Sequence, residues 1–137
     1  MTINLNPYLN FDGNTREAME FYQSVLGGEL NISTFGEFGA PDGTDPNGTM
    51  HASLAADGGL LIFASDTPPG ASVTSGNNFS ISLSGDDAAT LRRYWDGLAD
   101  GAQITMPLER QMWGDDFGML VDKFGMPWMV NIAGSAG

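Results

Sequence analysis

Hydrophobic and polar residues alternate along the first eleven positions of the chain. The apolar residues stand at odd positions and the polar-face residues between them, namely Ile3, Leu5, Leu9 and Phe11 against Asn4, Asn6, Tyr8 and Asn10. Successive side chains of a β-strand point to opposite faces of its sheet. The pattern therefore predicts a strand that starts at Ile3 and has one apolar face and one polar face.

A helix is predicted directly after this strand, beyond the turn pair Asp12-Gly13. Asn14 is a favourable N-cap, and Glu17 three residues later completes a capping-box pattern. Apolar residues then recur at helical spacing and form a single stripe, made of Ala18, Phe21, Tyr22, Val25 and Leu26. Gly27 stands where a helix often ends in a left-handed residue, so we expect the helix to stop there.

Three further strands complete the first half of the chain. Alternation predicts strands over residues 30–36 and 50–55, and a short apolar run predicts another over residues 60–64. A polar loop, rich in Gly, Pro and Asp, separates the first two. Residues 67–77 are rich in Ser, Pro and Gly, and we expect them to link two half-modules, at about residues 1–66 and 78–133.

The second half of the chain repeats the order of the first. Phe21-Tyr22 corresponds to Tyr94-Trp95 and Gly28 to Gly101, at the same offset of 73 residues. An alternating strand begins near Phe79, Asp86 or Asp87 caps a helix, and three strands are expected over residues 102–108, 117–122 and 127–132.

The repeat predicts an α+β fold in which two βαβββ modules form one domain of residues 1–137. Each helix is expected to cover the apolar face of its own four-stranded sheet. The polar faces of the two sheets are expected to line a shared cleft, and such concavities are where small ligands commonly bind.

Composition excludes several classes of function. The net charge is −12, with four Arg and one Lys, so the chain offers no basic patch to nucleic acid or to an anionic membrane. It has no Cys and therefore no disulfide or thiol chemistry. No apolar run is long enough to cross a bilayer, and the N-terminus shows no export signal. We therefore expect a cytoplasmic protein.

Motifs in this order resemble the PhnB-like branch of the vicinal oxygen chelate superfamily, which includes glyoxalase I, bleomycin-resistance proteins and extradiol dioxygenases. The resemblance covers nearly the whole chain. It rests on Tyr8-Leu9-Asn10-Phe11-Asp12-Gly13, Ala18-Met19-Glu20-Phe21-Tyr22, Leu26-Gly27-Gly28, Thr34-Phe35-Gly36-Glu37, Met50-His51-Ala52, Ala64-Ser65-Asp66, Ser80-Ile81-Ser82-Leu83, Trp113-Gly114, Asp122-Lys123-Phe124-Gly125 and Pro127-Trp128-Met129-Val130-Asn131. It implies a glyoxalase-like fold that pairs as a homodimer.

The resemblance also implies where a divalent metal ion would bind, and the residues there do not suit one. Metal enzymes of the superfamily place His, Gln or Glu ligands on the first and last strand of each module. The corresponding positions here are Asn6, Ser80, Phe63 and Met129. Hard cations prefer carboxylate and imidazole donors, so we expect no metal at these positions and no cofactor.

His51 is the single histidine of the chain, and by parity it lies on the polar face of its strand. Two readings stay open for it. In one, His51 is a catalytic base or a hydrogen-bond donor to a ligand, with Glu37 as a second catalytic group or metal ligand. In the other, His51 is structural, and Glu37 and Asp66 are acids exposed to solvent at strand ends.

The remaining candidate residues would line a ligand pocket. We expect Tyr8, Asn10, His51, Phe63, Ser82 and Trp113 to face the cleft. Trp113 and Trp128 carry rings that could stack on a flat ligand, although Trp128 also suits a core or a dimer interface.

The sequence favours a small-molecule binding protein that lacks the superfamily's usual metal ligands, as in bleomycin-resistance proteins, which sequester a ligand without chemistry. The alternative is a lyase or isomerase, or an atypical metal-dependent enzyme, that uses His51 and Glu37.

Overall fold

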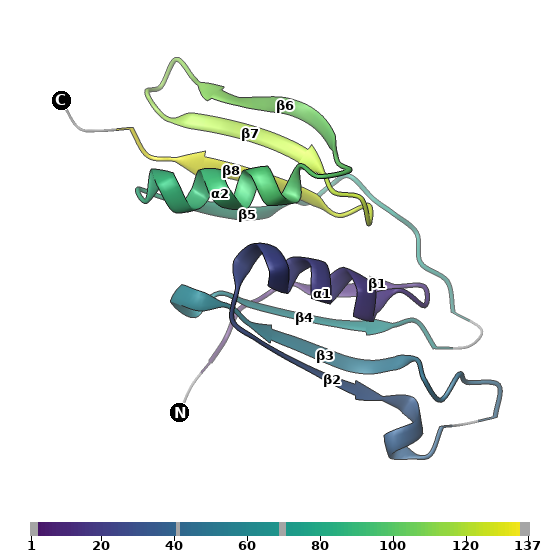
Figure 1. The fold of residues 1–137 in the computed structure, drawn as a ribbon. Helices are drawn as coiled ribbons and strands as arrows, with labels where there is room; N and C mark the ends of the chain where they lie inside the picture. Colours follow the sequence, from purple (N-terminus) through teal and green to yellow (C-terminus); the bar gives the residue numbers. More distant parts are fainter. Residues whose placement is uncertain (1–2, 41, 69–70, 135–137) are drawn as a thin grey trace. The chain divides into compact units, whose positions relative to one another are not determined.

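The computed structural model describes residues 3–40, 42–68 and 71–134 of the chain. Residues 69 and 70 of the predicted linker lie outside the described residues. The chain divides into two compact units, Met1–Thr74 and Ser75–Gly137. Each unit contains one four-stranded sheet with one α-helix packed on one of its faces (Figure 1).

The first unit has the order strand, helix, three strands. Its elements are β1 (Tyr8–Phe11), α1 (Thr15–Leu26), β2 (Glu29–Thr34), the short 3₁₀ helix η1 (Phe35–Phe38), β3 (Thr49–Ala55), the short 3₁₀ helix η2 (Asp57–Gly59) and β4 (Leu61–Asp66). The strands lie in the order β1-β4-β3-β2. β1 and β4 are parallel, and the other neighbours are antiparallel.

The second unit has the same topology. Its elements are β5 (Ile81–Gly85), α2 (Ala88–Leu98), β6 (Gln103–Arg110), β7 (Asp116–Val121) and β8 (Pro127–Ile132). The strand order is β5-β8-β7-β6, with a parallel β5–β8 pair. Two βαβββ modules are thus present, and the predicted α+β class is confirmed.

Each helix buries its apolar stripe against the apolar face of its sheet. In the first unit α1 buries Ala18, Met19, Tyr22 and Leu26, and the sheet contributes Leu9, Phe11, Ala52, Leu54, Ile62 and Ala64. In the second unit α2 buries Leu91, Tyr94, Trp95 and Leu98, and the sheet contributes Leu83, Leu120, Trp128, Val130 and Ile132. The period-two and helical patterns of the sequence predicted most of these two cores. Met19, which is fully buried, was outside the predicted stripe of α1, and Phe21 and Val25, which were in it, are partly exposed.

Gly118 on β7 shows how closely the second core is packed. A Cβ atom built on Gly118 would lie 2.8 Å from the Leu108 Cα and 2.8 Å from the Trp95 ring. Real Cβ atoms do not approach other heavy atoms this closely. Glycine is therefore required here for β6 and α2 to approach β7.

The first strand is shorter than the alternation predicted. β1 begins at Tyr8, and Ile3 is 96% exposed. The parallel partner of β1 is β4, and the pairing of the two strands begins with Tyr8 opposite Phe63. Pro7 precedes Tyr8 and has no N–H to donate to a ladder. The prediction of a strand from Ile3 was therefore wrong for residues 3–7.

The start of α1 is capped by a distant carboxylate, and the predicted capping box with Glu17 was wrong. The Asn14 side chain makes no capping hydrogen bond. Instead Asp66, at the end of β4, accepts from the Thr15 N–H at 3.1 Å and from the Thr15 hydroxyl at 2.6 Å. Asp66 also accepts from the N–H of Thr49, the first residue of β3, at 2.8 Å.

Asp66 is only 7% exposed, so the expectation of a solvated acid at this strand end was also wrong. A buried carboxylate is tolerated only where hydrogen bonds replace its lost hydration. Here three donors from two elements satisfy it, and the carboxylate in turn connects β4 with α1 and β3.

A second buried carboxylate serves the other unit. Asp122, in the turn between β7 and β8, accepts from the N–H groups of Phe124 and Met126 at 2.8 and 3.0 Å. It also accepts from the indole N–H of Trp128 at 2.8 Å. The bond fixes the ring of Trp128 within the core of the second unit.

We predict that Asp66→Asn lowers the free energy of unfolding by about 1–3 kcal/mol. The amide keeps one acceptor oxygen but turns an NH₂ group toward donors that need an acceptor. Urea denaturation followed by circular dichroism measures the loss. Asp42→Asn, at an exposed position, is the matched control and should change stability little. Equal stability of the two variants would contradict the role assigned to Asp66.

Candidate functional site

The face of the first sheet opposite α1 carries most of the residues that the sequence analysis selected. Leu9, Ala52 and Ala64 face α1, so their neighbours in each strand face the other way. We call this side the open face of the first unit. It presents Tyr8 and Asn10 from β1, Phe63 and Ser65 from β4, and His51 and Ser53 from β3.

Strand pairing brings these side chains into neighbouring rows. Tyr8 pairs with Phe63, which also pairs with Ser53. Asn10 pairs with Ser65 in the next row. His51 pairs with Ser33 of β2 on its other side. Serine and asparagine side chains, which can donate or accept hydrogen bonds, thus stand next to the rings of Tyr8, His51 and Phe63 on this face.

Tyr8, His51 and Phe63 form an aromatic cluster on the open face of the first unit. The ring centroids of His51 and Phe63 lie 5.2 Å apart with planes at 69°, and those of Tyr8 and Phe63 lie 6.4 Å apart at 85°. The Tyr8 and His51 centroids lie 6.0 Å apart. These are favourable edge-to-face or tilted arrangements. Three residues distant in the sequence are therefore held together by three adjacent strands.

The aromatic cluster is accessible. Tyr8 is 49% exposed, and His51 and Phe63 are partly exposed. An imidazole can donate and accept a hydrogen bond, and the rings beside it offer apolar area. The cluster can therefore hold a flat molecule and hydrogen-bond to its edge.

Glu37 has a local structural contact. It lies in η1, and its Oε2 atom accepts from the N–H of Thr34 at 2.9 Å, as in a capping box. In the described part of the chain Glu37 makes no hydrogen bond or ion pair with His51. The structure thus brings His51 together with Tyr8 and Phe63, and it gives Glu37 a separate role at the end of β2.

The four positions implied for a divalent metal ion do not fit one. The Asn6 amide donates to the Pro7 carbonyl at 3.1 Å, and Phe63 belongs to the aromatic cluster. Ser80 precedes β5, and Met129 pairs with Ser82. Neither a phenyl ring nor a thioether is a ligand for a hard cation. Across residues 3–40, 42–68 and 71–134, no three His, Cys, Asp or Glu side chains group closely enough to hold a metal.

Ser82, Trp113 and Trp128 belong to the second unit. Ser82 is exposed on the face of that sheet opposite α2. Trp113, in the loop before β7, lies edge-on to Phe117 with ring centroids 6.0 Å apart and is exposed. Trp128 is only 1% exposed and is bonded to Asp122, so the structure places it in the core. This placement does not support Trp128 as a ligand-binding residue.

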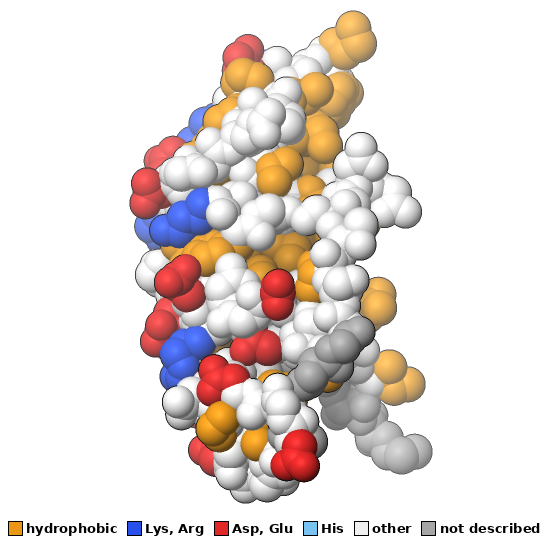
Figure 2. Space-filling model, turned by 90° about the vertical axis from the view of Figure 1, so that its right-hand side faces the viewer, with side chains coloured by type: hydrophobic (Ala, Val, Ile, Leu, Met, Phe, Trp, Pro, Cys, Tyr) orange, Lys and Arg blue, Asp and Glu red, His pale blue; other side chains and the backbone are white. Residues whose placement is uncertain are grey.

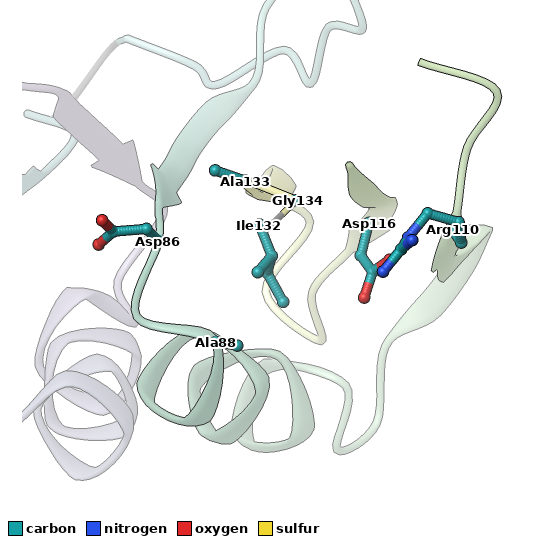
Figure 3. Close-up of a pocket in the computed structure, with 7 residues that line it drawn as sticks. All are labelled: Asp86, Ala88, Arg110, Asp116, Ile132, Ala133 and Gly134. Atoms are coloured by element: carbon teal, nitrogen blue, oxygen red, sulfur yellow. The ribbon is translucent and has the colours of Figure 1, made fainter. Parts of the chain in front are cut away.

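A cavity of about 550 Å³ in the second unit was not anticipated from the sequence. It is lined by Asp86, Ala88, Arg110, Asp116, Ile132, Ala133 and Gly134. In Figure 3 Arg110 and Asp116 lie together on one side of it, and Asp86 points away from them. No local motif marks this cavity because its lining comes from four separate parts of the second unit.

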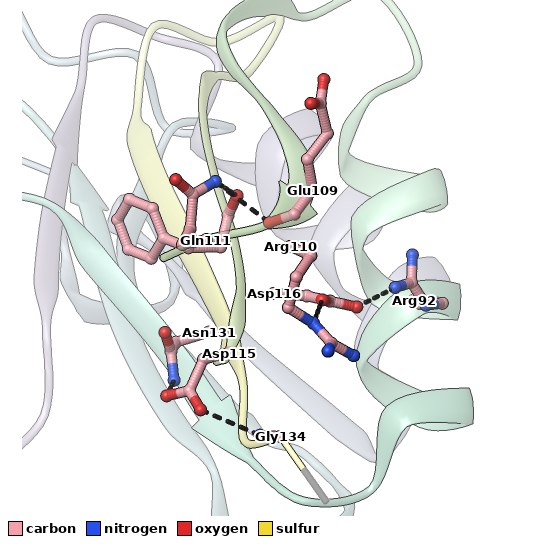
Figure 4. A network of polar contacts seen from close by, with 9 residues as sticks. Arg92, Glu109, Arg110, Gln111, Asp115, Asp116, Asn131 and Gly134 are labelled. Atoms are coloured by element: carbon pink, nitrogen blue, oxygen red, sulfur yellow. Dashed lines mark hydrogen bonds and ion pairs between the residues drawn. The ribbon is translucent and has the colours of Figure 1, made fainter. Parts of the chain in front are cut away.

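The charged side chains of this cavity are already paired. Asp116 forms ion pairs with Arg92 of α2 and with Arg110 of β6, the latter at 2.9 Å (Figure 4). The hydrogen bond from Arg110, together with the charges of Arg110 and Arg92, holds the pKa of Asp116 below its usual range. The network connects α2 to the edge of the sheet, and we assign it a structural role.

Two neighbouring contacts close the same end of the sheet. Asp115 accepts from the Asn131 amide at 3.0 Å and from the Gly134 N–H at 2.9 Å. The hydrogen bond from Asn131, which has the larger effect, and the one from Gly134 hold the pKa of Asp115 below its usual range. Both bonds are drawn in Figure 4, and they connect the start of β7 with the end of β8, where Gly134 also lines the cavity.

Acidic groups dominate the charge of the whole chain. The net charge is −12, and Figure 2 shows acidic side chains scattered over the face that it presents, with a few basic ones between them. The resulting field favours cationic or neutral ligands over anions. Neither α1 nor α2 is long and apolar enough to cross a membrane, nor is any other helix in the described residues.

The chain matches the family described as "Glyoxalase/Bleomycin resistance protein/Dioxygenase superfamily" over residues 4–130. It therefore belongs to this superfamily, and the predicted family is confirmed. Protein YjdN of Escherichia coli (strain K12) is 34% identical over 140 residues, which cover 93% of this chain and 94% of YjdN.

Solved structures share the fold. Protein PA1353 from Pseudomonas aeruginosa is 36% identical, with a TM-score of 0.83 over 98% of this chain and 100% of that chain. A PhnB protein from Bacillus cereus, described as a putative 3-demethylubiquinone-9 3-methyltransferase, is 23% identical, with a TM-score of 0.76 over 96% of this chain and 100% of that chain. At that identity the likeness shows the fold alone.

We predict that the Asp116 network stabilises the protein in a pH-dependent way. A carboxyl whose pKa falls on folding contributes stability above the pKa of the unfolded chain, and loses it as the pH falls toward the folded-state pKa. Urea denaturation should show Asp116→Asn less stable than wild type near neutral pH, with the difference shrinking below about pH 4. Asp100→Asn, at an exposed position, should show little difference at any pH. A difference for Asp116→Asn that is as large at pH 3 as at pH 7 would contradict this role.

Proposed function

We propose that the protein binds a small molecule on the open face of its first unit and carries out no metal-dependent chemistry there. The observation that carries the proposal is the aromatic cluster of Tyr8, His51 and Phe63, whose rings lie 5.2–6.4 Å apart on an accessible sheet face. The superfamily membership of the chain supports this class of function.

The chemistry of the face favours a flat, partly aromatic ligand. Tyr8 and Phe63 offer ring surface for stacking, and His51 offers a hydrogen bond in the same place. Asn10, exposed one row away, offers an amide for further hydrogen bonds. The net charge of −12 favours a neutral or cationic molecule. Contributions of Ser82 and Trp113 from the second unit remain predictions.

The residues at the positions implied for a metal ion support binding without a hard divalent ion. These positions hold Asn6, Ser80, Phe63 and Met129, which include neither carboxylate nor imidazole.

We further propose that the protein is a cytoplasmic homodimer that sequesters its ligand.

A lyase or isomerase that uses His51 and Glu37 is the second candidate. It requires a base and a partner group at the same reacting atom. Glu37 is bonded to the Thr34 N–H within its own turn, and this contact favours the binding function over catalysis.

We predict that alanine at Tyr8 or His51 weakens ligand binding at least tenfold and leaves the fold intact. A thermal-shift screen against metabolites and antibiotics identifies a ligand that raises the melting temperature. Its affinity is then measured calorimetrically for wild type, Tyr8→Ala and His51→Ala. Phe38→Ala, an exposed aromatic position in η1, is the matched control and should bind as wild type does. EDTA should leave the affinity unchanged.

Two results would overturn the proposal. One is wild-type affinity in both variants, with their melting temperatures unchanged. The other is loss of binding on addition of EDTA with recovery on addition of Mn²⁺ or Zn²⁺. If His51→Ala alone fails to fold, His51→Gln and Tyr8→Ala supply the same comparison.

A further inference from the structure

Three methionines stand side by side across the second sheet. Met129 of β8 pairs with Met119 of β7, and Met119 pairs with Met106 of β6, which lies between two register shifts of the β6–β7 pairing. Residues directly opposed in an antiparallel pair project to the same face of the sheet. The three side chains therefore form one row, which we call the thioether row.

The thioether row lies on the face opposite α2. The residues next to Met119 and Met129 in their strands, Leu120 and Val130, are buried against the helix side. Met106 is 40% exposed, and Met119 and Met129 are partly exposed. All three sulfur-bearing side chains are thus on an accessible sheet face rather than in the core.

The spacing suits a shared ligand. Neighbouring strands lie about 4.8 Å apart, and Met119 stands on the middle strand of the three. Methionine has three rotatable bonds, so its sulfur can lean sideways over a neighbouring strand. The outer two sulfurs, from Met106 and Met129, can therefore approach the one from Met119.

The composition of the row points to a soft ligand. Strands usually favour β-branched and aromatic residues, yet three of the eight methionines of the chain occupy three consecutive partner positions here. The row ends at Ser82, which pairs with Met129, and so includes no carboxylate or imidazole. Thioethers are poor ligands for hard cations and good ligands for Cu(I).

We propose that Met106, Met119 and Met129 form a site for one soft monovalent cation of the copper(I) class. The acidic charge of the chain attracts cations to it, and the three thioethers select the soft ones. The thioether row belongs to the second unit and shares no residue with the aromatic cluster of the first unit, so each proposal can fail without the other.

Silver(I), a stable substitute for copper(I), tests the proposal on the full-length protein. With the methionine methyl groups labelled with ¹³C, we expect the signals of Met106, Met119 and Met129 to shift together and to saturate at one Ag⁺ per chain. Met119→Leu, which keeps the volume and removes the central sulfur, should weaken Ag⁺ binding at least tenfold. Met106→Leu, at an exposed edge position, should weaken it as well.

Two control variants separate the site from general reactivity with silver. Met112→Leu removes a methionine that is 98% exposed and lies outside the row, and His51→Gln removes the imidazole. Both should bind Ag⁺ as wild type does. The proposal is overturned if Met112 responds at the same Ag⁺ concentration as the row, or if Met119→Leu and Met106→Leu both bind as wild type does. In either case the row is an ordinary apolar surface.

Discussion

The first unit depends on one buried carboxylate. Asp66 ends β4 opposite Phe11 of β1, and its oxygens accept from the first residue of α1 and the first residue of β3. One side chain on β4, the strand that pairs with β1, thus connects β4 to α1 and β3. Because a buried charge without these bonds would be costly, the arrangement has little freedom to slip. Phe63 and His51 stand on the two strands that it joins, β4 and β3, and Tyr8 stands on β1, which pairs with β4.

The positions of both proposed sites follow from the period of two along a strand. A shift of one residue in the β1–β4 or β7–β8 pairing would turn Phe63 or Met119 toward a helix. The buried residues beside them oppose such a shift, because it would expose Ala64 or Leu120 to solvent. The two units share one topology, and in both of them alternate residues of a strand face opposite sides of the sheet. The sheet faces opposite α1 and α2 nevertheless differ in chemistry, with aromatic rings and an imidazole on the first and thioethers on the second.

Local patterns in the sequence predicted the order of helices and strands, most of the two cores and the side of the sheet on which His51 lies. They did not predict contacts between distant residues. The cap of α1 comes from Asp66, 51 positions beyond Thr15, whereas Asn14 and Glu17 carried the local signal. The start of β1 at Tyr8 depends on where the partner strand β4 begins to pair with it, which alternation from Ile3 cannot show. The pairing of Arg92 and Arg110 with Asp116 likewise joins three elements and leaves no motif.

Binding at the aromatic cluster is the central claim, and side-chain NMR tests it most directly. A ligand found by thermal shift is titrated into protein with ¹³C-labelled aromatic and histidine rings, with assignments from single substitutions. The account predicts that the ring signals of Tyr8, His51 and Phe63 shift with one common binding curve, while those of Phe38 stay in place. Shifts confined to residues around the Arg110–Asp116 cavity, with the Tyr8, His51 and Phe63 signals unchanged at saturation, would contradict it.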